Sequence, residues 1–436
     1  MKVDYAASRS TVRPMLLLVY VIVLPITGRW LFEWDVRMAL VAFFALLLPM
    51  FALLRWPHAP LALMTGFILM LVGKLTYAIT TDPLAGPDEV HYYEQVTGFE
   101  RLSQFLPYAM EHFQTQWMNI SAYPVFGLLY MPYYKWLQLD DPLAIIWLNT
   151  VLLMLTVNST FQLNDRYFSY PLPEEGRETF DRTLIITLLA SPSMMYMSSI
   201  FAKDVTCVLL GLYGACLMLR KKWLLFIVII AYATGLRDYA IVYTLCFYWL
   251  YSRRLKAAIG VLAAACAVIV LQIGPLGLIN AGMLTIFLFI SPNPVKLSNW
   301  EPELMLRTAE ALLMTFVLIA SVYQFVRRKE TRPFYTIAFI LMFTYACSLV
   351  LVGYVTVMGR SLEYGLGTIG DNMVRKKLPV IPLIYTMGAY TFAWSGGLSL
   401  FKRLKILSKS SKAVLIDRLL PPRDGAKHKG GAPIER

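Results

Sequence analysis

The chain has 436 residues, of which 58% are hydrophobic and 15% are charged, with a formal net charge of +13. A soluble domain carries nearer a quarter of charged residues, so the composition argues against a soluble enzyme. The basic residues stand in short clusters between apolar runs and in the C-terminal tail, where orientation signals belong, and this argues against a nucleic-acid partner. The cysteines lie in apolar runs without CxxC or Cys/His spacing, so neither a disulfide framework nor a zinc site is expected.

Apolar runs long enough to cross a bilayer recur along the whole chain and predict an all-α polytopic membrane protein. Residues 1–59 should hold two extra transmembrane helices after a basic start, and no cleavable signal is expected. Further apolar runs lie at roughly 60–80, 143–162, 183–200, 205–219, 257–274, 307–326, 333–355 and 379–398. Between them, the run 223–236 is short for a span, and the chain then returns from Tyr239 to the basic stretch that begins at Ser252. Counting back from the basic loops gives about twelve spans with both termini cytoplasmic.

Three segments are expected on the outer face, at 81–142, 275–304 and 356–378. Within the first, residues 122–136 are apolar and aromatic but short, and they are interpreted as a juxtamembrane helix. The second contains four prolines and is expected to be re-entrant or to lie on the membrane surface. Residues 60–400 would then form the transmembrane core, and 401–436 a basic cytoplasmic tail attracted to lipid headgroups.

The most polar stretch beside the membrane is Gly86-Pro-Asp-Glu-Val-His-Tyr-Tyr-Glu-Gln95. The Gly-Pro turn ends an apolar run, which places Asp88 at a helix N-cap and Glu89 in the first turn, where carboxylates are favoured. Tyr92 and Tyr93 follow at helical spacing, so acid and aromatics can share a face. By itself the stretch also fits an ordinary capped loop helix.

Three further charged groups return to the same expected face: Lys203-Asp204, Arg237-Asp238, and Asp371 with Arg375-Lys-Lys377. Each alone also fits a helix-end ion pair or a snorkelling anchor. Together they gather acids and bases on the outer face, whereas the inner clusters are almost purely basic. Such a site suits a phosphate leaving group, which Arg and Lys neutralise while a carboxylate takes a proton from an acceptor hydroxyl.

Other catalytic templates are missing from the sequence, which has no GxSxG, HExxH or Walker motif. His91 and His112 are expected to be surface or hydrogen-bonding residues rather than metal ligands. Carboxylates together with a lipid phosphate could hold a divalent cation, although nothing in the sequence requires one.

This layout resembles the GT-C superfamily of integral-membrane glycosyltransferases, which use polyprenyl-phosphate sugar donors. The segment starting at Asp88 is similar to that superfamily's Asp-Glu…Tyr motif in the first large outer loop, and residues 123–149 are similar to its second juxtamembrane helix and following span. Residues 191–204 resemble an outer helix end that carries a second functional carboxylate, and 372–382 resemble an Arg…Leu-Pro…Pro stretch of bacterial members. The likeness covers roughly 60–400, but here about three spans precede the acidic loop instead of one, and no sizeable C-terminal outer domain follows.

The resemblance implies that Asp88 is a general base toward the acceptor and that Asp204 is a second acidic residue of the site; Glu89 joins them as a catalytic candidate. It makes Lys203, Arg237 and Arg375 candidates for binding the lipid phosphate. Candidates for the remaining substrate contacts are Asp238, His91 and Tyr92. The implied reaction is hexosyl or pentosyl transfer from a polyprenyl-phosphate-linked sugar to a cell-envelope glycan or lipid acceptor at the outer face.

Two other functions remain open. A polysaccharide polymerase that joins lipid-linked repeat units would have similar Arg-rich outer loops. A transporter of lipid-linked glycans typically places charges near the bilayer midplane on broken helices, often in repeated halves. Because no convincing repeat is seen and most charges lie at span ends, the enzyme is the favoured hypothesis.

Overall fold

The computed structural model describes residues 60–395 except 116–121, 175, 360–362 and 370–372. The first two predicted spans, the basic tail and Asp371 therefore lie outside the described residues. Within the described part every regular element is a helix, as the sequence predicts.

The first half of this part contains α4 (Pro60–Thr80), α5 (Pro87–Thr97), α6 (Leu102–Thr115), α7 (Ala122–Leu137), the 3-10 helix η1 (Pro142–Ala144), α8 (Ile145–Tyr167), α9 (Gly176–Leu189), α10 (Pro192–Met197), α11 (Asp204–Leu219) and α12 (Trp223–Leu236). The second half contains α13 (Ala240–Ser252), α14 (Leu255–Gln272), α15 (Pro275–Ile290), η2 (Leu297–Trp300), α16 (Pro302–Arg327), η3 (Lys329–Thr331), α17 (Arg332–Gly359), α18 (Met373–Lys377), η4 (Leu378–Val380) and α19 (Ile381–Trp394).

Four helical stretches of the described residues are long and apolar enough to cross a membrane: Pro142–Tyr167, Leu255–Gln272, Pro302–Arg327 and Lys329–Gly359. Shorter apolar helices are Met64–Tyr77, Asp204–Leu219, Trp223–Leu236, Ala240–Ser252 and Pro275–Ile290. The prediction of an all-α chain with membrane-compatible helices is confirmed at this level, and the finer count of about twelve spans stays a prediction.

The span predicted at 183–200 is not a single helix, and whether this segment crosses a membrane stays a prediction. Helix α9 ends at Leu189 and α10 begins at Pro192. Proline has no N–H to donate and fits best in the first turn of a helix, and Pro192 stands at the first position of α10. Ser191 is the N-cap of α10, because its hydroxyl accepts a hydrogen bond from the backbone N–H of Met194 at 3.2 Å.

The segment 275–304, expected to be re-entrant or to lie on the membrane surface, begins with a regular helix, and its placement relative to a membrane stays a prediction. Its first sixteen residues form the apolar helix α15. This helix packs against α16 and α17 within the bundle. The prolines that favoured an irregular segment lie at its first position and beyond its end, where they do not interrupt a helix.

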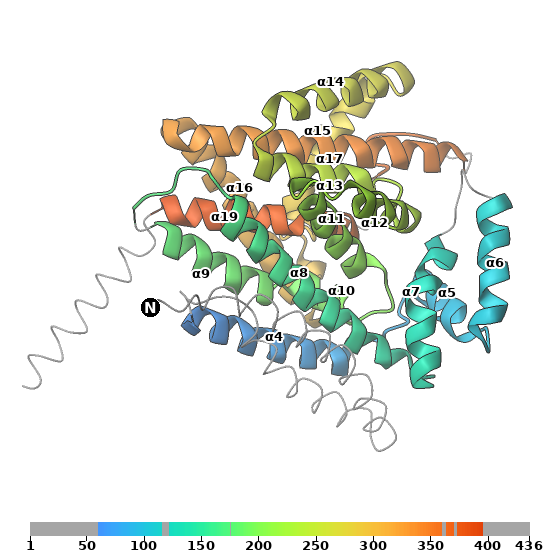
Figure 1. Cartoon of the computed structure of the whole chain (residues 1–436). Coiled ribbons are helices and arrows are strands. Elements are labelled where there is room, and N and C mark those ends of the chain that lie inside the picture. Colours follow the sequence, from blue (N-terminus) through green and yellow to red (C-terminus); the bar gives the residue numbers. More distant parts are fainter. Residues whose placement is uncertain (1–59, 116–121, 175, 360–362, 370–372, 396–436) are drawn as a thin grey trace, which may run out of the picture.

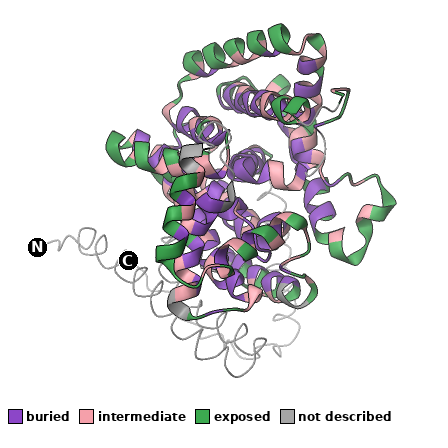
Figure 2. Ribbon diagram, turned by 90° about the vertical axis from the view of Figure 1, so that its right-hand side faces the viewer, coloured by how far each residue is buried: buried purple, intermediate pink, exposed green. Residues whose placement is uncertain are grey.

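The bundle is centred on α11, which packs against α8, α12 and α13. Helix α19 packs on α9, and α9 packs on α4, whereas α14 and α15 cover α17 (Figure 1). Buried residues face the inside of this bundle and exposed residues lie on its periphery (Figure 2). Apolar side chains on that periphery include Leu224 and Leu271, which are 83% and 85% exposed. Such exposure is unfavourable in water and compatible with a lipid surround.

Helices α5, α6 and α7 stand together at one end of the bundle (Figure 1). They form within the segment 81–142, and α7 covers the stretch interpreted as a juxtamembrane helix. Helix α5 packs on α7, where the ring of Tyr92 lies 4.5 Å from that of Phe126. This contact fixes the acidic start of α5 against the bundle.

Candidate functional site

The first acidic segment of the site is the start of α5. Gly86 is its N-cap in an extended conformation, and Asp88 and Glu89 both lie in the first turn. The prediction that Asp88 is the N-cap is therefore wrong by two residues, but the helix dipole favours both carboxylates there. The Glu89 side chain folds back on Gly86, where any Cβ would collide with its carboxylate. Glu89 is buried, whereas the Asp88 side chain is 50% exposed.

Asp204 is the first residue of α11 and is completely buried. Its Oδ1 accepts a hydrogen bond from Nη2 of Arg237, and its Oδ2 lies 3.3 Å from Nε of Arg375. Arg237 follows α12 as its C-cap, where the negative end of the helix dipole favours a cation. It also donates to the hydroxyl of Tyr239, a neighbour that sequence reasoning did not place in the site. Both oxygens of Asp204 are thus engaged by guanidinium groups.

Arg375, on the short helix α18, connects the two acidic segments. Its Nη1 lies 3.0 Å from Oδ2 of Asp88 and 3.4 Å from Oε1 of Glu89, while its Nε faces Asp204. Asp88 and Arg375 are 287 positions apart in the chain. The tertiary fold therefore joins α5, α11, α12 and α18 in one ion cluster, which we call the Arg375 cluster.

Lys203 lies beside the Arg375 cluster as the N-cap of α11. Its Nζ is 5.7 Å from the centroid of the Tyr92 ring, a distance at which an ammonium is attracted to an aromatic face. Tyr92 is buried, with 2% of its surface exposed. The position of this cation is thus set by the helix end and by the aromatic contact between α5 and α7.

Burial and charge act against each other at these groups. Burial and, to a smaller extent, the charge of Arg237 together lower the pKa of Lys203 to about 8. Burial raises the pKa of Glu89 above its usual range, although the Arg375 guanidinium opposes the shift. Burial also disfavours the ionised form of Asp204, but Arg237, Arg375 and Lys203 together outweigh it and hold the pKa of Asp204 below its ordinary value.

Two substrate-binding candidates lie apart from the Arg375 cluster. His91 is exposed on α5, and its Nδ1 is 3.2 Å from Oε2 of Glu94. Asp238 is exposed in the turn after Arg237, and none of the ion pairs among the described residues includes it. The remaining candidates of the sequence analysis meet in or beside the cluster: Asp88, Glu89, Tyr92, Lys203, Asp204, Arg237 and Arg375.

A divalent cation does not fit this arrangement. The Arg375 guanidinium lies between the carboxylates of Asp88, Glu89 and Asp204, at the place where a bridging cation would have to sit. Over the described ranges, no group of three or more His, Cys, Asp or Glu side chains is arranged to hold a metal ion. The described side chains of the Arg375 cluster are therefore arranged as ion pairs and not as a metal site.

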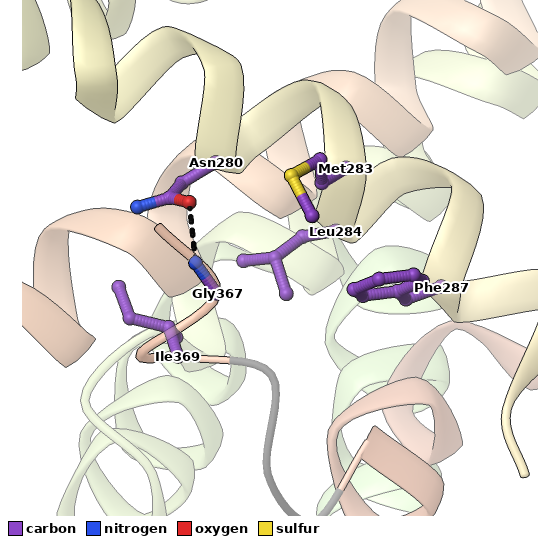
Figure 3. A pocket seen from close by; sticks show the side chains of 6 residues that line it. All are labelled: Asn280, Met283, Leu284, Phe287, Gly367 and Ile369. Atoms are coloured by element: carbon purple, nitrogen blue, oxygen red, sulfur yellow. Dashed lines mark hydrogen bonds between the residues drawn. The ribbon is translucent and has the colours of Figure 1, made fainter. Parts of the chain in front are cut away.

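A small pocket lies elsewhere, between α15 and the segment 364–369 (Figure 3). Its lining residues are Asn280, Met283, Leu284, Phe287, Gly367 and Ile369. The side chain of Asn280 is fully used there: Oδ1 accepts from the N–H of Gly367 at 3.0 Å, and Nδ2 donates to the hydroxyl of Tyr364 at 2.7 Å. This pocket is a packing junction rather than a ligand site.

Sequence reasoning missed the charged residues inside apolar helices. Glu310 of α16 is buried, accepts a hydrogen bond from the Ser191 hydroxyl at 2.7 Å and lies 3.5 Å from Nζ of Lys377. Lys74 of α4 is buried and donates to the Ser198 hydroxyl at 2.8 Å. The signal was present, because an ionisable group within an apolar run is costly unless it has a partner. The sequence analysis weighed only the span ends.

Comparisons of the chain with protein-family models, with curated proteins and with solved structures found no match. The fold and the site define the class of protein to this extent: a helical, membrane-compatible chain with a partly buried cluster of guanidiniums and carboxylates at one end of its bundle. The resemblance to the GT-C superfamily stays a proposal.

Proposed function

We propose that this protein is a membrane glycosyltransferase of the GT-C type. It would transfer a sugar from a polyprenyl-phosphate donor to a cell-envelope glycan or lipid acceptor at the outer face of the plasma membrane. The observation that carries the proposal is the Arg375 bridge, which joins carboxylates of α5 and α11 through one guanidinium. Cations for a phosphate and a carboxylate for a proton are thus within one cluster, as such a transfer requires.

The cations of the cluster suit the donor phosphate. Arg375 and Arg237 present planar guanidiniums, which bind phosphate oxygens in pairs. Lys203 adds a point charge at the N-terminus of α11, where backbone N–H groups also favour an anion. Together they would stabilise the charge that develops on the leaving phosphate as the glycosidic bond breaks.

The two acidic segments suit different tasks. The Asp88 side chain is half exposed at the edge of the Arg375 cluster, so an acceptor hydroxyl can reach it. We assign Asp88 the role of general base. Asp204 is completely buried with both oxygens engaged by Arg237 and Arg375, so it would position these guanidiniums rather than touch substrate.

Binding of the lipid phosphate tests the proposal most directly. The purified full-length protein in lipid nanodiscs would be titrated with undecaprenyl phosphate, with the alcohol undecaprenol as the control for the chain alone. We expect saturable binding of the phosphate only. Arg375→Met should weaken it strongly but measurably, because Arg237 and Lys203 remain, whereas Arg101→Met, at an exposed arginine of the segment between α5 and α6, should leave it unchanged. Equal binding of alcohol and phosphate, or full binding by Arg375→Met, would remove the donor site.

Sugar transfer is tested separately. Glycolipids radiolabelled in their sugars would be extracted from a bacterial membrane and offered to the protein together with acceptor-containing membranes. Loss of a general base typically lowers turnover by about 10²–10⁴-fold, so Asp88→Asn should transfer almost no label. It should bind undecaprenyl phosphate at least as tightly as the unsubstituted protein, because the carboxylate that pairs with Arg375 is removed. Transfer by Asp88→Asn at the unsubstituted rate would exclude the assigned role. If the unsubstituted protein itself binds the lipid phosphate but transfers no label, the proposed enzymatic function fails.

A further inference from the structure

The carboxylate of Glu310 is the centre of a second, fully buried polar cluster. It accepts hydrogen bonds from the Ser191 hydroxyl at 2.7 Å, from the Ser193 hydroxyl and from the Tyr385 hydroxyl. Nζ of Lys377 lies 3.5 Å away. These partners come from three elements other than α16: the start of α10, the end of α18 and α19. One carboxylate thus connects four elements.

One of these connections leads directly to Arg375. Lys377 stands two residues after Arg375 on α18, a helix of five residues. A helix this short has no stability of its own, so its orientation depends on its tertiary contacts. Lys377 provides two, to Glu310 and to the backbone carbonyl of Ser291 at 2.8 Å. The backbone carbonyl of Lys376 adds a third by accepting from the Tyr345 hydroxyl at 2.5 Å.

The other connection leads to Asp204. Ser191 and Ser193 form the first turn of α10, and the N–H of Ser193 also points at Glu310, at 3.3 Å from Oε2. The chain then runs from α10 through a short turn to Lys203 and Asp204. A carboxylate at the start of α10 therefore fixes the segment that delivers the buried acid of the Arg375 cluster.

We infer that Glu310 is a positioning residue for the Arg375 cluster: it holds α18 through Lys377 and the α10–α11 connection through Ser191 and Ser193. Glu310 touches none of the reacting groups, and its effect passes through the segments it anchors. The inference rests on the proposed function for its catalytic meaning, whereas the anchoring itself can be measured without a ligand.

The negative charge of Glu310 is required for this role. Lys377 is completely buried, and an ammonium removed from water is tolerated only with a charged or strongly hydrogen-bonding partner. Glu310→Gln keeps the size and an acceptor oxygen but leaves Lys377 without its counter-charge. A change of charge alone can therefore be distinguished from a change of shape.

Hydrogen–deuterium exchange of the full-length protein in nanodiscs, without any ligand, tests the anchoring. Glu310→Gln should speed exchange in two separate segments, 192–204 and 373–380. Glu303→Gln, an exposed glutamate two turns away on the same helix, is the matched control and should leave both segments unchanged. If Glu310→Gln changes neither segment, or only the surroundings of α16, the inference is overturned.

Undecaprenyl phosphate binding tests the consequence for the site. We expect Glu310→Gln to weaken binding about tenfold or more, the usual effect of leaving a buried charged group without its partner. In an Arg375→Met background the same change should weaken binding little further, while its effect on exchange persists, because Glu310 acts through Arg375. Equal weakening in both backgrounds would overturn the inference. If the unsubstituted protein binds no undecaprenyl phosphate, the proposed function fails, and the exchange result alone decides the anchoring role.

Discussion

Replacing Asp204 by Asn examines the buried half of the site. Asp204 is completely buried, and its two oxygens face Arg237 and Arg375. In the variant, Arg237 keeps no ion partner among the described residues, whereas Arg375 retains Asp88 and Glu89. Removing one member of a buried ion pair costs about 3–5 kcal/mol. Because one of the two arginines keeps its partners, we expect the lower end, about 3 kcal/mol.

Asp88→Asn is the matched contrast, because it removes a carboxylate from the same cluster on the exposed side. An exposed pair contributes at most about 1 kcal/mol. Thermal denaturation of both full-length variants in one detergent, followed by fluorescence-detected size exclusion, compares them. At roughly 2 °C per kcal/mol, Asp204→Asn should denature about 6 °C below the unsubstituted protein and Asp88→Asn within about 2 °C. Equal losses, or no loss for Asp204→Asn, would refute the argument that buried charge pairing governs this site.

Three further outcomes are expected. Because the pKa of Lys203 is about 8, its side chain is mostly charged near pH 7 and mostly neutral near pH 9. Undecaprenyl phosphate binding should therefore weaken over that interval in the unsubstituted protein and stay level in Lys203→Arg. A level profile for the unsubstituted protein would remove Lys203 from the site. Gly86→Ala places a Cβ against the Glu89 carboxylate and should weaken undecaprenyl phosphate binding several-fold. Gly260→Ala, whose Cβ meets open space, should leave that binding unchanged. Equal titration curves for the two variants would contradict a role of the Gly86–Glu89 contact in binding. Asn280→Leu removes the hydrogen bonds that hold the segment 364–367. The groups left unpaired cost about 1–3 kcal/mol, so hydrogen exchange in this segment should become faster. Unchanged exchange would show that these hydrogen bonds do not order the segment.

The sequence allowed the meeting of distant charges to be predicted for a physical reason. Apolar helices exclude ionisable groups from their interiors, so charges gather at helix ends, and ends on one side of a bundle lie near one another. Asp88, Asp204, Arg237 and Arg375 all stand at or near helix ends and do meet. Asp238 also stands at a helix end, but it is exposed, because the turn after α12 directs only one of two adjacent charges inward.

The features that could not be predicted depend on contacts between helices, which a hydropathy pattern does not show. A run of apolar residues does not show whether it folds as one helix or as two, so the helix break before Pro192 was not predicted. The pattern also did not predict that α15 packs on α17, because the face of α15 that contacts α17 is as apolar as the rest of the helix. The Glu310–Lys377 contact joins residues 67 positions apart, and only the packing of α16 against the segment 373–380 brings them together.

The exposure of the three carboxylates sets the order in which Arg375 can exchange partners. Asp204 is buried and shared with Arg237, and Glu89 is buried against Gly86, so neither can leave without disturbing the fold. Asp88 is half exposed, and water can solvate its carboxylate once the guanidinium turns away. A phosphate that binds Arg375 would therefore displace Asp88 first, since guanidinium–phosphate pairs are strong and bidentate. In the proposed reaction, arrival of the donor would release the general base beside the leaving group, whereas without donor the base would stay paired with Arg375.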